Sequence, residues 1–224
     1  MKEAVIVPIS QKERIVIVDI LRGWALLGVV IVNYYLYFYR WGDGLITQDD
    51  VFSQILKFLT DILFRNKSRI MLNILFGFGF SVLITKLKAK GETVVWFFGR
   101  RMFWLFVIGI INSCFYYGDF LKEYAIVGIL LLLFHNATAK SSLIFGIIFL
   151  LIYPISSHYL GHIYSLDWSA DIKLFESSNV FHCLWYGLQE GAKAVYEPIR
   201  LFGANLFALA CFLIGQFLHK YDFF

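Results

Sequence analysis

The chain has 224 residues, of which 59% are hydrophobic and only 16% are charged, and its formal net charge at pH 7 is +4. Soluble globular domains contain about 45–50% apolar and about 25% charged residues, so this composition excludes an ordinary soluble domain. The apolar residues form continuous runs of roughly 18 or more, which favours membrane-spanning helices over a β-barrel of short alternating segments. The basic residues cluster at the ends of these runs, where they set topology, so no nucleic-acid partner is expected.

Six membrane spans are predicted, and the fold class is an all-α, polytopic integral membrane helical bundle embedded in the lipid bilayer. The spans cover roughly 15–38, 69–87, 102–117, 120–136, 141–160 and 199–218. Residues 1–14 are expected to form an N-terminal segment, 15–220 the transmembrane helical domain with an outer loop at about 161–198, and 221–224 a C-terminal tail.

The first span carries three polar residues in the apolar run "VDILRGWALLGVVIVN". Arg22 and Asn33 lie about 20° apart around a helix and about 16 Å apart along it, and Asp19 lies within roughly 60° of both. One interpretation is an i, i+3 ion pair between Asp19 and Arg22 near the inner interface. The other is that Arg22 lies at the mouth of a cavity and binds a phosphate-bearing ligand from the cytoplasm, which its guanidinium fork suits.

Residues 51–64 are apolar but too short to span a membrane. The polar face of this segment holds Gln54, Lys57 and Asp61, and its apolar face holds Phe52, Ile55, Leu59 and Ile62. Such a pattern is typical of an amphipathic helix lying in the membrane interface.

Topology follows from the basic residues in short loops. They crowd the connection between the second and third expected spans, which carries Lys86, Lys88, Lys90, Arg100 and Arg101. Such loops face the cytoplasm, so we expect this connection and both termini on the inner side of a multi-pass protein of the cytoplasmic (inner) membrane. Arg65, Lys67 and Arg69 would then lie on the outer side, which indicates a reason other than topology for their presence.

No metal site is predicted. Cys114, Cys183 and Cys211 are scattered without metal-binding or redox spacing and are expected to be buried thiols. His158 and His162 could share one helical face as ligands, but His182, Asp167 and Asp171 supply no third ligand in register. Loop polarity and an interfacial helix explain the same residues.

Four blocks of the sequence resemble, in order, blocks of the YeiB-like membrane proteins. They are "RIVIVDILRGWALLGVVIVN", "NKSRIMLNILFGFGFSVLI", "RRMFWLFVIGIIN…YYGDFLKEYAIVG" and "LFALACFLIGQFLHK", and they cover most of residues 14–220 apart from the outer loop. The YeiB-like proteins belong to a wider superfamily of transmembrane acyltransferases, with the heparan-α-glucosaminide N-acetyltransferases and bacterial sugar O-acyltransferases.

The resemblance implies transfer of an acyl group from a cytoplasmic acyl-CoA, such as acetyl-CoA, to a sugar or envelope-type acceptor at or across the membrane. On this basis Arg22 would engage the donor phosphates, and Asp19 and Asn33 would line the path through the membrane. The other donor-binding or cavity-lining residues would be Lys67, Arg100, Arg101 and Tyr124, with Asp119 at the outer end of the cavity.

Two departures from the family pattern bear on catalysis. Asn33 stands where the sugar O-acyltransferases have a histidine, as it does in the YeiB-like branch. Asn112 stands at the histidine of the third block, and asparagine cannot take up a proton near neutral pH. Asp119 and Asn112 stay catalytic candidates, and Asp43, Asp49 and Asp50 could equally supply a base.

Two alternatives stay open. The chain ends shortly after the fourth block, whereas family members continue with further spans, so it could be an incomplete fragment or need a second chain or homo-oligomer to complete the bundle. It could also be a non-catalytic transport or scaffolding subunit, in which small residues mediate helix contacts. These residues are Gly77, Gly79, Gly109 and Gly128.

Overall fold

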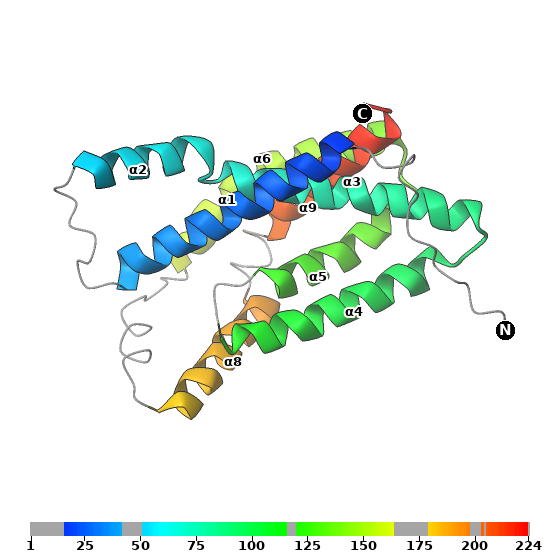
Figure 1. Ribbon diagram of the computed structural model, residues 1–224. Helices are drawn as coiled ribbons and strands as arrows, with labels where there is room; N and C mark the ends of the chain where they lie inside the picture. Colours follow the sequence, from blue (N-terminus) through cyan, green and yellow to red (C-terminus); the bar gives the residue numbers. More distant parts are fainter. Residues whose placement is uncertain are drawn as a thin grey trace. The chain divides into compact units, whose positions relative to one another are not determined.

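The computed structural model describes residues 16–41, 51–115, 120–163, 179–197, 203 and 205–223, and every regular element in these ranges is helical. In chain order these elements are α1 (Val16–Trp41), α2 (Val51–Leu63), α3 (Lys67–Ala89), α4 (Val94–Ser113), α5 (Leu121–Leu131), the 3-10 turn η2 (Leu132–Phe134), α6 (Ala139–Ile163), α8 (Val180–Tyr196) and α9 (Asn205–Lys220) (Figure 1). The all-α prediction is confirmed.

Four stretches are long and apolar enough to cross a membrane. They are Val16–Tyr34, Val51–Ala89, Val94–Ser113 and Ala139–Leu160. The helices found within the other two expected spans are shorter, with 11 residues in α5 and 16 in α9. At 1.5 Å per residue, α5 covers about 17 Å of a hydrocarbon core that is about 30 Å thick. The number of six spans therefore stays a prediction.

The expected outer loop contains a helix that the sequence reading did not predict. α8 has 17 residues, and its N-terminus is capped by Asn179, whose side-chain oxygen accepts a hydrogen bond of 3.0 Å from the Phe181 N–H. Glycine lowers helix propensity, and Gly187 and Gly191 weaken the local helix signal. Packing of both glycines against the end of α4 supplies the stability that propensity does not.

The chain divides into two compact units, residues 1–75 (with 224) and 76–223, and the boundary falls inside α3. In the first unit α1 packs on the turn between α2 and α3. A Cβ atom built on Gly28 would lie 2.0 Å from the Ser68 hydroxyl oxygen and 2.5 Å from a ring carbon of Phe64. The ring centroids of Trp24 and Phe64 are 5.4 Å apart. Only a residue without a side chain permits this close approach.

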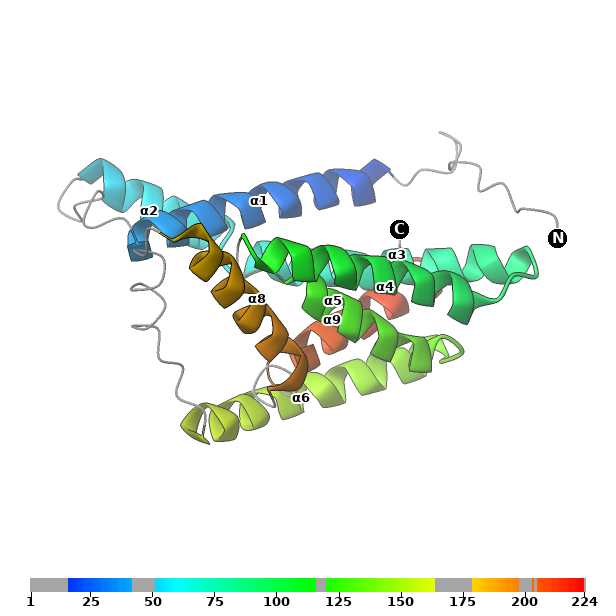
Figure 2. The same cartoon turned by 90° about the horizontal axis from the view of Figure 1, so that it is seen from below.

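α5 is the central helix of the second unit. Its buried residues are Lys122, Glu123, Tyr124, Ala125, Val127, Gly128 and Leu131. It contacts α4, α8 and α9, while α6 packs along α9 (Figures 1 and 2). Polar and apolar residues of α5 are buried alike, so α5 is not an amphipathic helix with one solvated face. The surrounding helices cover it instead.

Glycines let the helices of the second unit approach closely. A Cβ atom on Gly77 would lie 1.9 Å from the Phe212 carbonyl oxygen of α9, and one on Gly109 would lie 2.5 Å from the Lys122 nitrogen of α5. Small residues at helix contacts are the usual means of packing apolar helices, because dispersion forces then act between backbones. Gly77 and Gly109 are two of the four glycines for which helix contacts were expected.

We predict that Gly77→Ala lowers the stability of the purified protein by about 1–3 kcal/mol, because the new methyl group meets backbone atoms that cannot move aside. Gly99→Ala in α4 is the matched control, since a Cβ atom there has no neighbour within 4 Å. Alanine is favoured over glycine inside a helix by about 0.5–1 kcal/mol, so the control should be as stable as the parent or more so. Thermal unfolding in detergent measures both, and equal melting temperatures for the two variants would contradict the α3–α9 packing.

Candidate functional site

The predicted ion pair on the first helix is present. Arg22 donates a hydrogen bond of 3.3 Å from Nη1 to Oδ1 of Asp19, and the side chains are 41% and 51% exposed, respectively. The pairing follows from the spacing, because residues three apart on a helix are neighbours. Only one guanidinium nitrogen is engaged, so the contact is not the two-point arrangement that gives Arg–carboxylate pairs their strength. An exposed pair of this kind contributes about 0–1 kcal/mol to stability.

Asn33 lies on the same continuous helix, α1, as Asp19 and Arg22. Its side chain is half-buried. Because no break interrupts α1 between these positions, the regular helical spacing holds and the three polar groups follow one stripe. The stripe contrasts with the exposed apolar residues of the same helix, among them Ile20, Leu27 and Val30.

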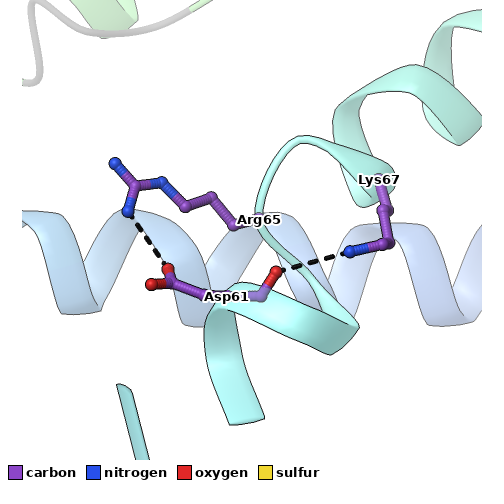
Figure 3. Close-up of polar contacts among 3 residues, drawn as sticks. All are labelled: Asp61, Arg65 and Lys67. Carbon is purple, nitrogen blue, oxygen red and sulfur yellow. Dashed lines mark hydrogen bonds and ion pairs between the residues drawn. The ribbon is translucent and has the colours of Figure 1, made fainter. Parts of the chain in front are cut away.

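Lys67 is the first residue of α3, directly after the turn that follows α2, and it has a local structural contact. Its ammonium donates a hydrogen bond of 3.4 Å to the carbonyl oxygen of Asp61, and Arg65 Nη1 lies 3.2 Å from Oδ1 of the same residue (Figure 3). Asp61 belongs to the last turn of α2, whose carbonyl groups have no partner within the helix. Cations favour this end of a helix, so Lys67 and Arg65 stabilise it. This contact gives a reason other than topology for two of the three basic residues expected on the outer side.

Three residues of α4 were singled out by the family resemblance, and none of them is fully buried. Arg100 and Arg101 are exposed in the second turn of the helix. Asn112 is half-buried in its last turn, where its carbonyl oxygen accepts a hydrogen bond of 3.0 Å from the Phe115 N–H. Asp119 lies outside the described residues, as do Asp43, Asp49 and Asp50.

Tyr124 is part of an aromatic cluster in the second unit. Its ring centroid lies 6.0 Å from that of Phe76 and 5.7 Å from that of Phe212, and these two phenylalanines stack at 4.5 Å. The side chain is 8% exposed. Tyr124 therefore has a packing role that its assignment as a cavity-lining residue did not anticipate.

A buried lysine is the main polar feature that the sequence reading missed. Lys122 has no exposed surface, and its chain runs from the contact with Gly109 towards Gly191 of α8, where a Cβ atom would lie 3.9 Å from Lys122 Cε. Ser113 is also buried there, and its hydroxyl donates to the Gly109 carbonyl oxygen at 2.8 Å. An ionisable residue within an apolar run is a signal for function. The position of Lys122 beside α8, however, depends on contacts between residues distant in sequence and could not be predicted from the sequence.

The cysteines and histidines form no metal-binding group of three or more with acidic residues in the part of the chain that the structure describes. None of the three cysteines forms a disulfide within the described residues. Cys211 is buried as expected, whereas Cys114 and Cys183 are half-buried. The side chain of His162 lies outside the described residues, together with Asp167 and Asp171.

Comparison with known proteins gives two bacterial relatives. YxaH of Bacillus subtilis (strain 168), an uncharacterized protein, is 26% identical over 95% of this chain and 61% of its own length. An uncharacterized 39.9 kDa protein from the amylase 3′ region of Bacillus acidopullulyticus is 34% identical over 66% of this chain and 42% of its own length. The chain thus covers less than two thirds of the curated relatives that it matches. No protein-family model matches the sequence, and no solved structure is significantly similar to it.

The end of α9 provides a pH-sensitive contact beyond the expected span 199–218. His219 Nδ1 lies 2.8 Å from the Ser81 hydroxyl, and the ring centroids of His219 and Phe78 are 5.3 Å apart with the two rings nearly perpendicular. Burial lowers the pKa of His219 below its ordinary 6.5, with Asp222 acting to raise the pKa and Lys220 to lower it. The fold therefore favours the neutral imidazole.

We predict that the protein loses stability as the pH falls below about 6.5, because the unfolded chain then binds a proton that the folded His219 resists. Well above this pH, His219 is neutral in both the folded and the unfolded chain, so it does not contribute to the pH dependence of stability. In His219→Gln, which keeps a polar partner for Ser81, the loss between about pH 6.5 and 5 should be smaller. Thermal melting across this range measures the slopes, and identical slopes for parent and variant would contradict the assignment.

Proposed function

We propose that this protein is a YeiB-like integral membrane protein with about six spans and an acyltransferase-like activity. In this proposal it takes an acyl group from cytoplasmic acyl-CoA, such as acetyl-CoA, and passes it to a sugar or envelope-type acceptor at or across the cytoplasmic membrane. Both termini lie on the cytoplasmic side, and α2 lies in the interface. The four sequence blocks support the family assignment, and the long apolar helices support a place in the membrane.

The observation that carries the donor role is the incomplete pairing of Arg22. The guanidinium has five N–H donors, and its contact with Asp19 uses one nitrogen at 3.3 Å. An arginine within an apolar span is costly to keep unless it has a functional partner. A phosphate group of the donor can bind the remaining edge of the guanidinium by two parallel hydrogen bonds.

The topology proposed for the chain brings the donor to the right end of α1. Arg22 lies in the second turn of this helix, about 9 Å along the axis from Val16, and the N-terminus is expected in the cytoplasm. Arg100 and Arg101 lie in the second turn of α4, near the connection expected on the same side. Both are exposed, so they can add positive charge for an anionic donor.

The acceptor side has fewer assigned residues. Asp119 would lie at the outer end of the path and is the carboxylate of the third block. Asn112 can donate a hydrogen bond to a developing oxyanion but cannot act as a base. Asp19 would hold Arg22 in position, Asn33 would continue the polar stripe, and the contact of Lys67 with Asp61 makes it an outer-side anchor.

A non-catalytic role in transport or scaffolding is the second candidate. Tyr124 is packed between aromatic rings, and Lys67 is hydrogen-bonded at the end of α2. Both arrangements suit structural residues. In this case the polar stripe of α1 would line a permeation path or contact a partner chain, and a second chain or a homo-oligomer would complete the bundle.

Calorimetric titration of acetyl-CoA into the detergent-purified chain tests the donor role. We expect the parent to bind, Arg22→Ala to lose at least tenfold in affinity through loss of a charged two-point contact, and Arg22→Lys to lose a substantial part of it. Arg65→Ala is the matched control. Arg65 is exposed and pairs with Asp61, and it is expected on the outer side of the membrane, away from the donor. Equal binding by all four proteins would remove Arg22 from the site, and no binding by the parent would favour the non-catalytic role.

A further inference from the structure

Two lysines from distant helices converge on the turn between η2 and α6 in the second unit. Lys88 of α3 donates a hydrogen bond of 2.7 Å from Nζ to the side-chain oxygen of Asn136. Lys220 of α9 donates from Nζ to the carbonyl oxygen of Ala137, the next residue. Because the two acceptors are consecutive in the chain, the two ammonium groups are held at the same turn.

The surrounding contacts fix this arrangement. Gln216, one helical turn before Lys220, donates a hydrogen bond of 2.9 Å from Nε2 to the Phe134 carbonyl oxygen. His219, three residues after Gln216, contacts the Ser81 hydroxyl of α3 at 2.8 Å. The end of α9 is thus hydrogen-bonded to both η2 and α3, and these contacts hold the backbone at Lys220 in place. A site built on regular elements in this way is more precise than one on a mobile loop.

The charges at this turn are not balanced. Each ammonium group has three N–H donors and uses one of them on a neutral acceptor, and neither lysine forms an ion pair within the described residues. Two like charges held at one turn repel one another. Burial lowers the pKa of Lys220, and the charge of Lys88 lowers it further. The carboxylate of Asp222 raises the pKa of His219.

We propose that Lys88 and Lys220 form a binding site for the phosphate of an anionic phospholipid headgroup. A phosphate diester between the two ammonium groups accepts hydrogen bonds from the N–H donors that Asn136 and Ala137 leave available. It also offsets the repulsion between the two cations. Basic clusters at the ends of membrane helices attract anionic lipids in this manner.

The adjoining helix favours a lipid over a soluble phosphate. α6 begins directly after the turn, and it exposes a series of apolar residues along its length: Ile144, Ile147, Ile148, Leu151 and Ile155. Lys140, in its first turn, is exposed as well. A headgroup at the lysine pair would leave its acyl chains beside this apolar surface. Charge and apolar area are thus adjacent, as a phospholipid requires and a free phosphate does not.

This site is independent of the proposed acyl transfer, since neither lysine belongs to the donor-binding residues. Binding can be measured on the full chain in detergent with short-chain phosphatidylglycerol, and with phosphatidylcholine and inorganic phosphate as separate probes. The variants are Lys88→Gln, Lys220→Gln and the double substitution. Lys90→Gln is the control, because Lys90 is an exposed lysine next to the end of α3.

We expect each single variant to weaken phosphatidylglycerol binding about fivefold and the double variant on the order of 25-fold, with Lys90→Gln near the parent value. The parent should bind phosphatidylcholine and inorganic phosphate much more weakly. Should Lys220→Gln fail to fold, the exposed Lys88→Gln alone decides the matter.

Three outcomes would overturn the site: equal lipid binding by parent and double variant, an equal loss in Lys90→Gln, or inorganic phosphate binding as tightly as the lipid. The first two mean general attraction to a basic surface, and the third means a soluble phosphate ligand. Arg22→Ala should bind the lipid normally and the double variant should bind acetyl-CoA normally, so failure of one proposal is distinguishable from failure of the other.

Discussion

The close contact between α3 and α9 at Gly77 and Phe212 is the interaction on which the second unit depends. Because no side chain separates the two backbones here, residues of α3 and α9 on either side of this point also contact one another. On one side Phe76 and Phe212 stack and enclose Tyr124. On the other, Ser81 of α3 contacts His219 in the last turn of α9. A larger residue at position 77 would separate all of these contacts together.

The apolar helices could be predicted from the sequence, because long hydrophobic runs have few alternative structures. α8 could not, since its helix depends on Gly187 and Gly191 fitting against Ser113 of α4, a contact between residues about 75 positions apart. The length of α5 was also overestimated. The apolar run extends to position 134, but the α-helix ends at Leu131 and gives way to a 3-10 turn.

The candidate site shows the same division between local and distant contacts. The pairing of Asp19 with Arg22 depends on helical spacing alone, so the sequence was sufficient to predict it. The aromatic surroundings of Tyr124 and the burial of Lys122 depend on how α4, α5, α8 and α9 meet. The lysine pair at the end of α9 has the same origin. Lys88 and Lys220 are 132 positions apart, and only the fold brings them to one turn.

The proposed donor role requires α3 to cross the membrane with its Lys67 end outside and its Lys90 end in the cytoplasm, and the lipid site requires the Lys90 end to lie at a membrane surface. Single cysteines, Lys67→Cys and Lys90→Cys, can be placed in a chain whose three native cysteines are replaced by serine and tested in cells with a membrane-impermeant thiol reagent. We predict that position 67 reacts in intact cells and that position 90 reacts only after the membrane is permeabilised. Reaction of both positions in intact cells, or of both only after permeabilisation, would contradict a membrane-spanning α3 and with it the acyl-donor site.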